Sequence, residues 1–246
     1  MHLLRASEPL PAAMEDAYRD ADKLVMEIDM ADLDPLAAQQ LTMELGMQPT
    51  GKTLTEDIGP ETTEKLDAYT KQLGIPTGML NQFKPWLAAI TLTQLQMLKM
   101  GLDPQSGIEQ RFLAKATSDH KEIQGLETIS EQLHLLADLP TPLQAQFLLQ
   151  TLTEAQEADQ EIEALLGAWR SGDAVALDKY SARGMKEFPK LYGPLTVERN
   201  RRWIGRLEEM LNADKNYLVI VGVLHLVGND GVVDLLQHQG YKIQQH

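Results

Sequence analysis

Histidine and glutamate side chains stand at the ends of the apolar segments of this sequence. His225 ends the apolar segment that begins at Tyr217, Glu27 lies inside the segment "LVMEID", and Glu127 ends "IQGLE". A carboxylate inside an apolar strand is costly unless it is paired or hydrogen-bonded. Sites in open α/β sheets form outside the carboxyl ends of the strands. Side chains of these types, gathered at that edge, would bind a divalent metal or act as general base and acid.

The same residues also have structural interpretations. A histidine at a strand end is more often a hydrogen-bonded structural residue, and Glu27 would then pair with an arginine of the core. Glu127 would cap the helix that follows it, because a carboxylate is favoured at a helix N-terminus. Arg199 and Asn200 would be ordinary residues in the first turn of the helix that begins near residue 196, without a role in a site.

Few strands and many helices are expected to position these side chains. Strands are predicted over residues 23–29, 120–127 and 216–225, and in "YKIQQ" near the C-terminus. Strands separated by helices indicate right-handed crossovers and an α/β core. We therefore predict a single domain over residues 1–246, α/β in class but mostly helical. It has a small mixed or parallel central sheet and helical insertions at about 33–118 and 129–212.

Two parts of the sequence share one pattern, in which a histidine is followed by a turn, a helix and a strand. One part begins at His225, which an apolar strand delivers, and the other begins at His2, which only Met1 precedes. A histidine at a frayed terminus is not held with the accuracy that a site requires. We therefore expect the natural chain to begin upstream with a further apolar strand, whose absence would leave segment 23–29 with unpaired backbone groups and an exposed apolar edge.

Composition excludes several classes of function. The 246 residues are 43% hydrophobic, carry a formal net charge of −14 and include no cysteine. This charge argues against a nucleic-acid groove, which needs clustered Lys and Arg. The lack of cysteine excludes disulfides and thiolate metal sites. The sequence shows neither a transmembrane stretch nor a signal peptide at Met1, although an upstream start would leave export open.

Three segments resemble the TraB/GumN family, which is similar to the TIKI metalloproteases and more distantly to erythromycin esterases and haem-binding ChaN proteins. They are residues 2–29, 106–128 and 197–241. The family's marks are two G-x-x-H motifs, a glutamate after the first crossover helix, an L-E pair and an R-N pair. The matching residues here are Gly222 with His225, then Glu27, Leu126 with Glu127, and Arg199 with Asn200, whereas the first G-x-x-H motif keeps only its histidine, His2.

This resemblance implies a hydrolase-like site centred on His2, Glu27 and His225. These three would bind Zn, Mn or Co, and the metal would activate water for cleavage of a peptide or small-molecule substrate. Glu27 or Glu127 would serve as ligand or general base, and Arg199 would hold a substrate carboxylate or an oxyanion. Two alternatives remain open: a metal-independent, esterase-like hydrolase with a histidine as base, and a non-catalytic protein that binds haem or a peptide.

Overall fold

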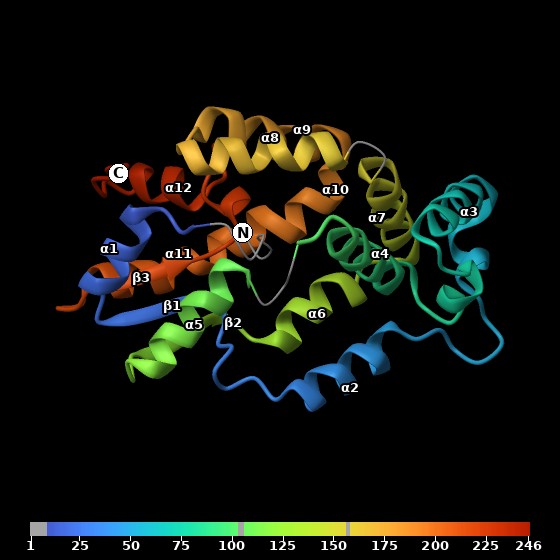
Figure 1. Ribbon diagram of the computed structural model, residues 1–246, viewed down its shortest axis with the longest axis horizontal. Coiled ribbons are helices and arrows are strands. Elements are labelled where there is room, and N and C mark those ends of the chain that lie inside the picture. The colour runs from blue at the N-terminus through green and yellow to red at the C-terminus, as the bar shows by residue number, and fades with distance from the viewer. Residues whose placement is uncertain (1–8, 103–105, 156–157) are drawn as a thin grey trace. The chain divides into compact units, whose positions relative to one another are not determined.

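The computed structural model describes residues 9–102, 106–155 and 158–246 (Figure 1). Over these residues the chain forms two compact units. The first combines the described parts of Met1–Leu33, Asp103–Thr128 and Glu163–His246, and the second combines those of Asp34–Leu102 and Ile129–Ile162. Every described residue of the candidate site belongs to the first unit.

A three-stranded parallel sheet forms the centre of the first unit. Its strands are β1 (Lys23–Ile28), β2 (Glu122–Glu127) and β3 (Tyr217–Ile220), in the order β2-β1-β3. The prediction of a mostly helical α/β fold with a small parallel sheet is confirmed. The expectation that segment 23–29 would have unpaired backbone groups along one edge is wrong, because β1 is the central strand and pairs on both sides.

Helices from distant parts of the sequence complete this unit. They are α1 (Ala12–Asp20), α5 (Ile108–Ser118), α9 (Ala174–Glu187), α10 (Pro189–Tyr192), the π-helix η3 (Gly193–Val197), α11 (Glu198–Leu211), the 3₁₀ turn η4 (Val223–His225) and α12 (Val232–His238). Helix α8 (Ala158–Ser171) crosses the boundary between the units in sequence. Trp203 and Leu207 of α11 pack against Val25 of β1 and Leu236 of α12, so a single apolar cluster fixes α11 beside the sheet.

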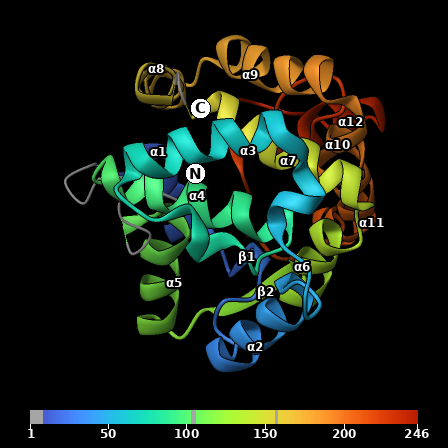
Figure 2. The same cartoon turned by 90° about the vertical axis from the view of Figure 1, so that its right-hand side faces the viewer.

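The second unit contains helices and, among its described residues, one isolated β-bridge between Met47 and Phe83. It contains α2 (Pro35–Gly46), α3 (Leu54–Leu73), the 3₁₀ helix η1 (Thr77–Leu80), α4 (Pro85–Lys99), α6 (Ile129–Ala137) and α7 (Thr141–Glu154). Helices α3, α4 and α7 lie side by side (Figure 2) around the fully buried Leu66, Leu92 and Leu148. Asp34 caps α2 by accepting hydrogen bonds from the backbone of two residues in the first turn.

One strand prediction is wrong in its extent, and another is wrong because no strand forms. Strand β3 ends at Ile220, so His225 lies in the turn η4 and not at the end of the strand. The backbone leaves the sheet at Gly222, whose N–H donates to the Glu27 carboxylate instead of to a neighbouring strand. The segment 241–245 forms no strand, because no described strand lies beside it to pair with its backbone.

Candidate functional site

Two glutamates meet at the carboxyl edge of the sheet. Glu27 lies near the end of β1, Glu127 is the last residue of β2, and the register pairs Ile28 with Glu127. The two strands are parallel, so both carboxylates emerge at the same edge. The side chains are only 12% and 4% exposed, and two carboxylates so deeply buried need a cation beside them.

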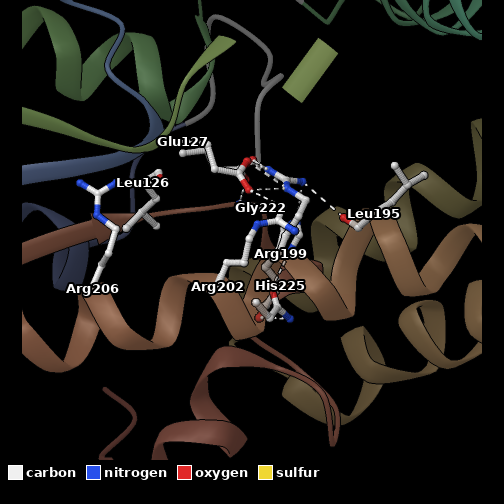
Figure 3. A network of polar contacts seen from close by, with 10 residues as sticks. Leu126, Glu127, Leu195, Arg199, Arg202, Arg206, Gly222 and His225 are labelled. Carbon is white, nitrogen blue, oxygen red and sulfur yellow. Dashed lines mark hydrogen bonds and ion pairs between the residues drawn. The ribbon is translucent and has the colours of Figure 1, made fainter. Parts of the chain in front are cut away.

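Arg199 of α11 is that cation. Its Nη2 donates to Glu27 Oε2 at 2.6 Å and to Glu127 Oε2 at 2.8 Å, and its Nε donates to Glu127 Oε2 at 3.0 Å. Its Nη1 donates to the Leu195 carbonyl at 3.4 Å, within the π-helix that leads into α11 (Figure 3). The interpretation of Glu27 as the partner of a core arginine is therefore correct, and that arginine is itself one of the predicted site residues.

The carboxylates of Glu27 and Glu127 stabilise the charged form of Arg199. Burial lowers the pKa of the Arg199 guanidinium, but the hydrogen bond to Glu127 and the negative charges of Glu27 and Glu127 outweigh burial, so the pKa is raised. Arg199 is therefore a permanent cation at the edge of the sheet. A fixed cation in a buried site is suited to holding a substrate carboxylate or a developing oxyanion.

His225 contacts Nη1 of Arg199, whereas the two glutamates contact Nε and Nη2. The amide nitrogen of Asn200 donates to the carbonyl of Asp230 at 2.7 Å, which turns the amide oxygen toward His225 Nδ1 at 2.6 Å. Nδ1 must therefore carry the hydrogen of this bond. In the neutral imidazole Nε2 is then an acceptor, and it lies 3.1 Å from Arg199 Nη1, which donates to it.

Three further side chains of α11 belong to the site and were not predicted from the sequence. Trp203 packs its ring 4.7 Å from the His225 ring and 4.9 Å from the Arg199 guanidinium. Arg202 reaches Glu127 Oε1 at 3.4 Å, and Arg206 donates to the Leu126 carbonyl at 2.8 Å. Positions three, four and seven residues after Arg199 lie on the same helix face, so the helical period would have pointed to all three.

Gly125 allows β2 to approach β1 closely beside the site. A Cβ atom at this position would lie 2.4 Å from the backbone nitrogen of Asp29 and 2.9 Å from the carbonyl oxygen of Glu127. No side chain fits in that space, so a glycine two residues before Glu127 is needed to place its carboxylate next to Arg199.

The structure brings together four of the five residues predicted as ligands or catalytic groups. Glu27, Glu127 and His225 all bond to the guanidinium of Arg199, whereas His2 lies outside the described residues. The metal site predicted from His2, Glu27 and His225 therefore stays a prediction. Over residues 9–102, 106–155 and 158–246, no group of three His, Asp or Glu side chains is placed to share one metal ion.

A metal ion does not fit the described residues in this arrangement. One terminal nitrogen of Arg199 contacts Glu27 and the other contacts His225, so the guanidinium occupies the position between these two expected ligands. A shared metal ion would require Arg199 to leave this position, since ligand atoms lie only about 2.0–2.2 Å from the ion. The described geometry places a fixed organic cation where the resemblance implied a metal.

Comparisons with known proteins agree over nearly the whole chain. The family model described as TraB/PrgY/gumN matches residues 1–245. The protein YbaP of Escherichia coli, which is described as uncharacterized, is 27% identical over 229 residues, covering 93% of this chain and 82% of YbaP. YbaP of Shigella flexneri matches with the same identity and coverage. No solved structure matches. Among the described residues, no helix is sufficiently long and apolar to cross a membrane.

Proposed function

Because the chain belongs to the TraB/PrgY/gumN family, and because Arg199 and His225 meet in a buried polar site, we propose that it is a hydrolase of peptide or ester bonds. The observation that carries the proposal is the contact between Arg199 Nη1 and His225 Nε2 at 3.1 Å. It places a permanent cation next to an imidazole nitrogen that has an acceptor lone pair. Acyl transfer to water needs these two groups together, one to polarise the carbonyl and one to take a proton.

His225 is the general base of the proposed reaction. Water first replaces Arg199 Nη1 as the partner of its Nε2 atom, and Nε2 then takes a proton from this water as the water oxygen bonds to the substrate carbonyl carbon. Nη1 of Arg199 leaves the Leu195 carbonyl and His225 Nε2, and its two hydrogens then bond to the carbonyl oxygen as negative charge develops there. The bond from carbon to the leaving nitrogen or oxygen then breaks, and the proton held by His225 passes to the leaving group.

Glu27 and Glu127 act through Arg199. Each carboxylate is bonded to the guanidinium, so together they keep the cation charged and fixed in orientation. Asn200 does the same for His225, because its amide oxygen fixes which ring nitrogen carries the hydrogen. These three are positioning residues of the proposed mechanism.

A metal-dependent peptidase is the second candidate. The observation that favours it is the convergence of two carboxylates and an imidazole on one edge of the sheet, since these are the ligand types that Zn, Mn and Co share. In this form His2 would supply a further ligand, and Arg199 would move to bind substrate.

The experiment measures hydrolysis of fluorogenic peptides and p-nitrophenyl esters by protein purified without chelators. Assays run with no addition, with EDTA, and with Zn or Mn added, alongside metal analysis of the purified protein. Activity that survives EDTA supports the base mechanism, and activity that EDTA abolishes and Zn or Mn restores supports the metal-dependent candidate.

The variant His225→Gln should lose hydrolysis in either form, whereas His238→Gln, at an exposed histidine, should retain it. Folded protein with no hydrolysis of either substrate class under any of these conditions would overturn the proposal. A haem titration at 400 nm then tests the non-catalytic alternative.

A further inference from the structure

Arg202 lies one helical turn after Arg199 and contacts the same carboxylate. Nε of Arg199 lies 3.2 Å from Glu127 Oε1, and Nη2 of Arg202 lies 3.4 Å from that same oxygen. Residues three positions apart share one face of a helix, and both guanidiniums project from α11 toward Glu127 (Figure 3). Two cations are therefore neighbours at the carboxyl edge of the sheet.

Glu127 does not depend on Arg202 for a cation. Arg199 already donates to both oxygens of the Glu127 carboxylate, through Nε and Nη2, at distances of 2.8–3.2 Å. Among the described residues, Arg202 adds one longer contact, and its side chain is 51% exposed. An ion pair of this kind contributes little to stability. Since a guanidinium has five N–H donors, the described contact leaves most of the donors of Arg202 available to a ligand.

The described part of this network contains more cations than anions. Arg199, Arg202 and Arg206 stand against Glu27 and Glu127, and Arg206 bonds to a backbone carbonyl instead of a carboxylate. The whole chain, in contrast, has a formal net charge of −14. A local excess of positive charge attracts an anionic group. Arg202 is suited to meet that anion, because its side chain is half-exposed whereas that of Arg199 is buried.

We propose that Arg202 determines substrate specificity by binding a carboxylate of the substrate. This inference rests on the proposed hydrolase function and names the class of its substrate, which is a peptide with a carboxylate close to the scissile bond. A guanidinium binds a carboxylate through two parallel hydrogen bonds. Arg199 holds the oxygen of the scissile carbonyl while Arg202 holds the carboxylate. An extended peptide advances about 3.3 Å per residue, so this carboxylate lies one or two residues from the scissile bond.

A peptide offers such a carboxylate either in an acidic side chain or at its C-terminus. Two pairs of synthetic peptides separate these sources. Acetyl-Ala-Ala-Asp-Ala-Ala-amide is compared with its Asn counterpart, and acetyl-penta-alanine with a free C-terminal carboxylate is compared with its amide.

Mass spectrometry of the products gives kcat and KM for each peptide. In at least one pair the acid should have a kcat/KM about tenfold higher than its neutral counterpart. The difference should lie mainly in KM, because the contact with the carboxylate is made before the transition state as well as in it. Equal kcat/KM values within both pairs would overturn the proposal.

The variant Arg202→Gln tests whether Arg202 makes this distinction. It removes the charge, so the preference for the acid should fall about tenfold, whereas Arg202→Lys keeps the charge and should retain part of the preference. The matched control is Arg201→Gln, at an exposed arginine of the same helix that pairs with Asp230, and it should keep the full preference. Circular dichroism checks that the three variants are folded.

Two results with these variants would contradict the role of Arg202. If Arg202 only supported Glu127, Arg202→Gln would slow hydrolysis of the acid and of its neutral counterpart by the same factor. A preference that survives Arg202→Gln unchanged would place the carboxylate elsewhere on the protein.

Binding of the same peptides separates this inference from the proposed function. Calorimetry with folded His225→Gln protein, which should not hydrolyse the peptides, compares the affinity of each acid with that of its neutral counterpart. Tighter binding of the acid by about tenfold, without hydrolysis by the unmodified protein, would refute the hydrolase and leave the carboxylate site at Arg202 standing. Hydrolysis without a preference for the acid, or equal binding of acid and neutral counterpart in both pairs, would overturn that site.

Discussion

Asn200 and His225 form a pair in which one amide fixes the chemistry of one imidazole. The amide oxygen lies 2.6 Å from Nδ1, while the amide nitrogen is held by the carbonyl of Asp230. Asn200 is fully buried, so it has no alternative partners in solvent. The result is that Nε2 is the acceptor that faces Arg199.

Replacement of this amide should cost stability and release the ring. Asn200→Ala leaves the Asp230 carbonyl and His225 Nδ1 without their partners, so we expect a loss of about 1–3 kcal/mol in the free energy of unfolding. Urea denaturation measures the loss, and ¹⁵N NMR of the imidazole should show the Nδ1–H tautomer in the unmodified protein. Asn212→Ala, at an exposed helix end, serves as the control. Equal stability of the two variants would contradict the role given to Asn200.

Removal of the central cation should destabilise the protein more. Arg199→Met leaves Glu27 and Glu127 buried without their shared cation, and we expect a loss of about 3–5 kcal/mol. Arg201→Met, on the exposed face of the same helix, should change stability little because its side chain is 66% exposed.

A double variant separates charge from packing. Adding Glu127→Gln to Arg199→Met removes one of the two buried carboxylates that lost Arg199, so part of the lost stability should return. Denaturation of the four proteins in this cycle gives the coupling energy. If the losses in the free energy of unfolding caused by the two substitutions simply add, Glu127 is not stabilised by the charge of Arg199.

Two glycines should respond to the same substitution with opposite signs. Gly125→Ala places a Cβ atom 2.4 Å from the Asp29 backbone nitrogen, so β2 must shift and we expect a loss of about 1–3 kcal/mol. Gly205→Ala meets no atom within 4 Å on α11 and should stabilise the helix by about 0.5–1 kcal/mol. Thermal unfolding followed by circular dichroism compares them. A Gly125→Ala protein as stable as the unmodified one would show that a Cβ atom fits between β2 and β1 at this position.

The stability of the protein should fall in alkali through Tyr18. Burial raises the pKa of Tyr18, and its hydrogen bond to Asp119 at 2.7 Å and the charge of Asp119 raise it further. The folded state therefore holds the phenol proton more tightly than the unfolded state does. The resulting stability is fully present below the unfolded pKa of about 10 and is lost as pH rises toward the folded pKa.

Tyr18→Phe removes this dependence. Above pH about 10 its free energy of unfolding should fall less steeply than that of the unmodified protein. Tyr180→Phe controls for the loss of a phenol elsewhere in the chain. Parallel pH profiles for Tyr18→Phe and the unmodified protein would exclude Tyr18 as the origin of the alkaline loss.

The sequence was most informative about the two continuous apolar segments that form β1 and β3. Residues 23–29 and 216–225 were predicted as strands because they contain continuous apolar runs, and they include the observed strands β1 (Lys23–Ile28) and β3 (Tyr217–Ile220). The predicted strand at 241–245 has a similar local pattern but no described neighbour, and a strand requires a partner that local sequence does not reveal.

The sequence predicted which residues form the site but not the contacts between them. Polar residues near strand ends pointed to Glu27, Glu127 and His225, but the sequence left open whether a metal or an arginine holds the carboxylates. That choice depends on a contact between residues 172 positions apart in the chain. Local patterns carry no information on such a pairing, although the helical spacing on α11 would have revealed Arg202, Trp203 and Arg206.

The sequence positions of the two glutamates and their arginine impose an order on biosynthesis. A ribosome completes both carboxylate-bearing strands before it begins α11, since Arg199 follows Glu127 by 72 residues. Until that helix emerges, the nascent chain holds two acidic side chains that have no shared cation to accompany them into an apolar core. Fragments that end before α11 should therefore stay open and sensitive to protease, and the sheet should close only once the last quarter of the polypeptide has left the exit tunnel.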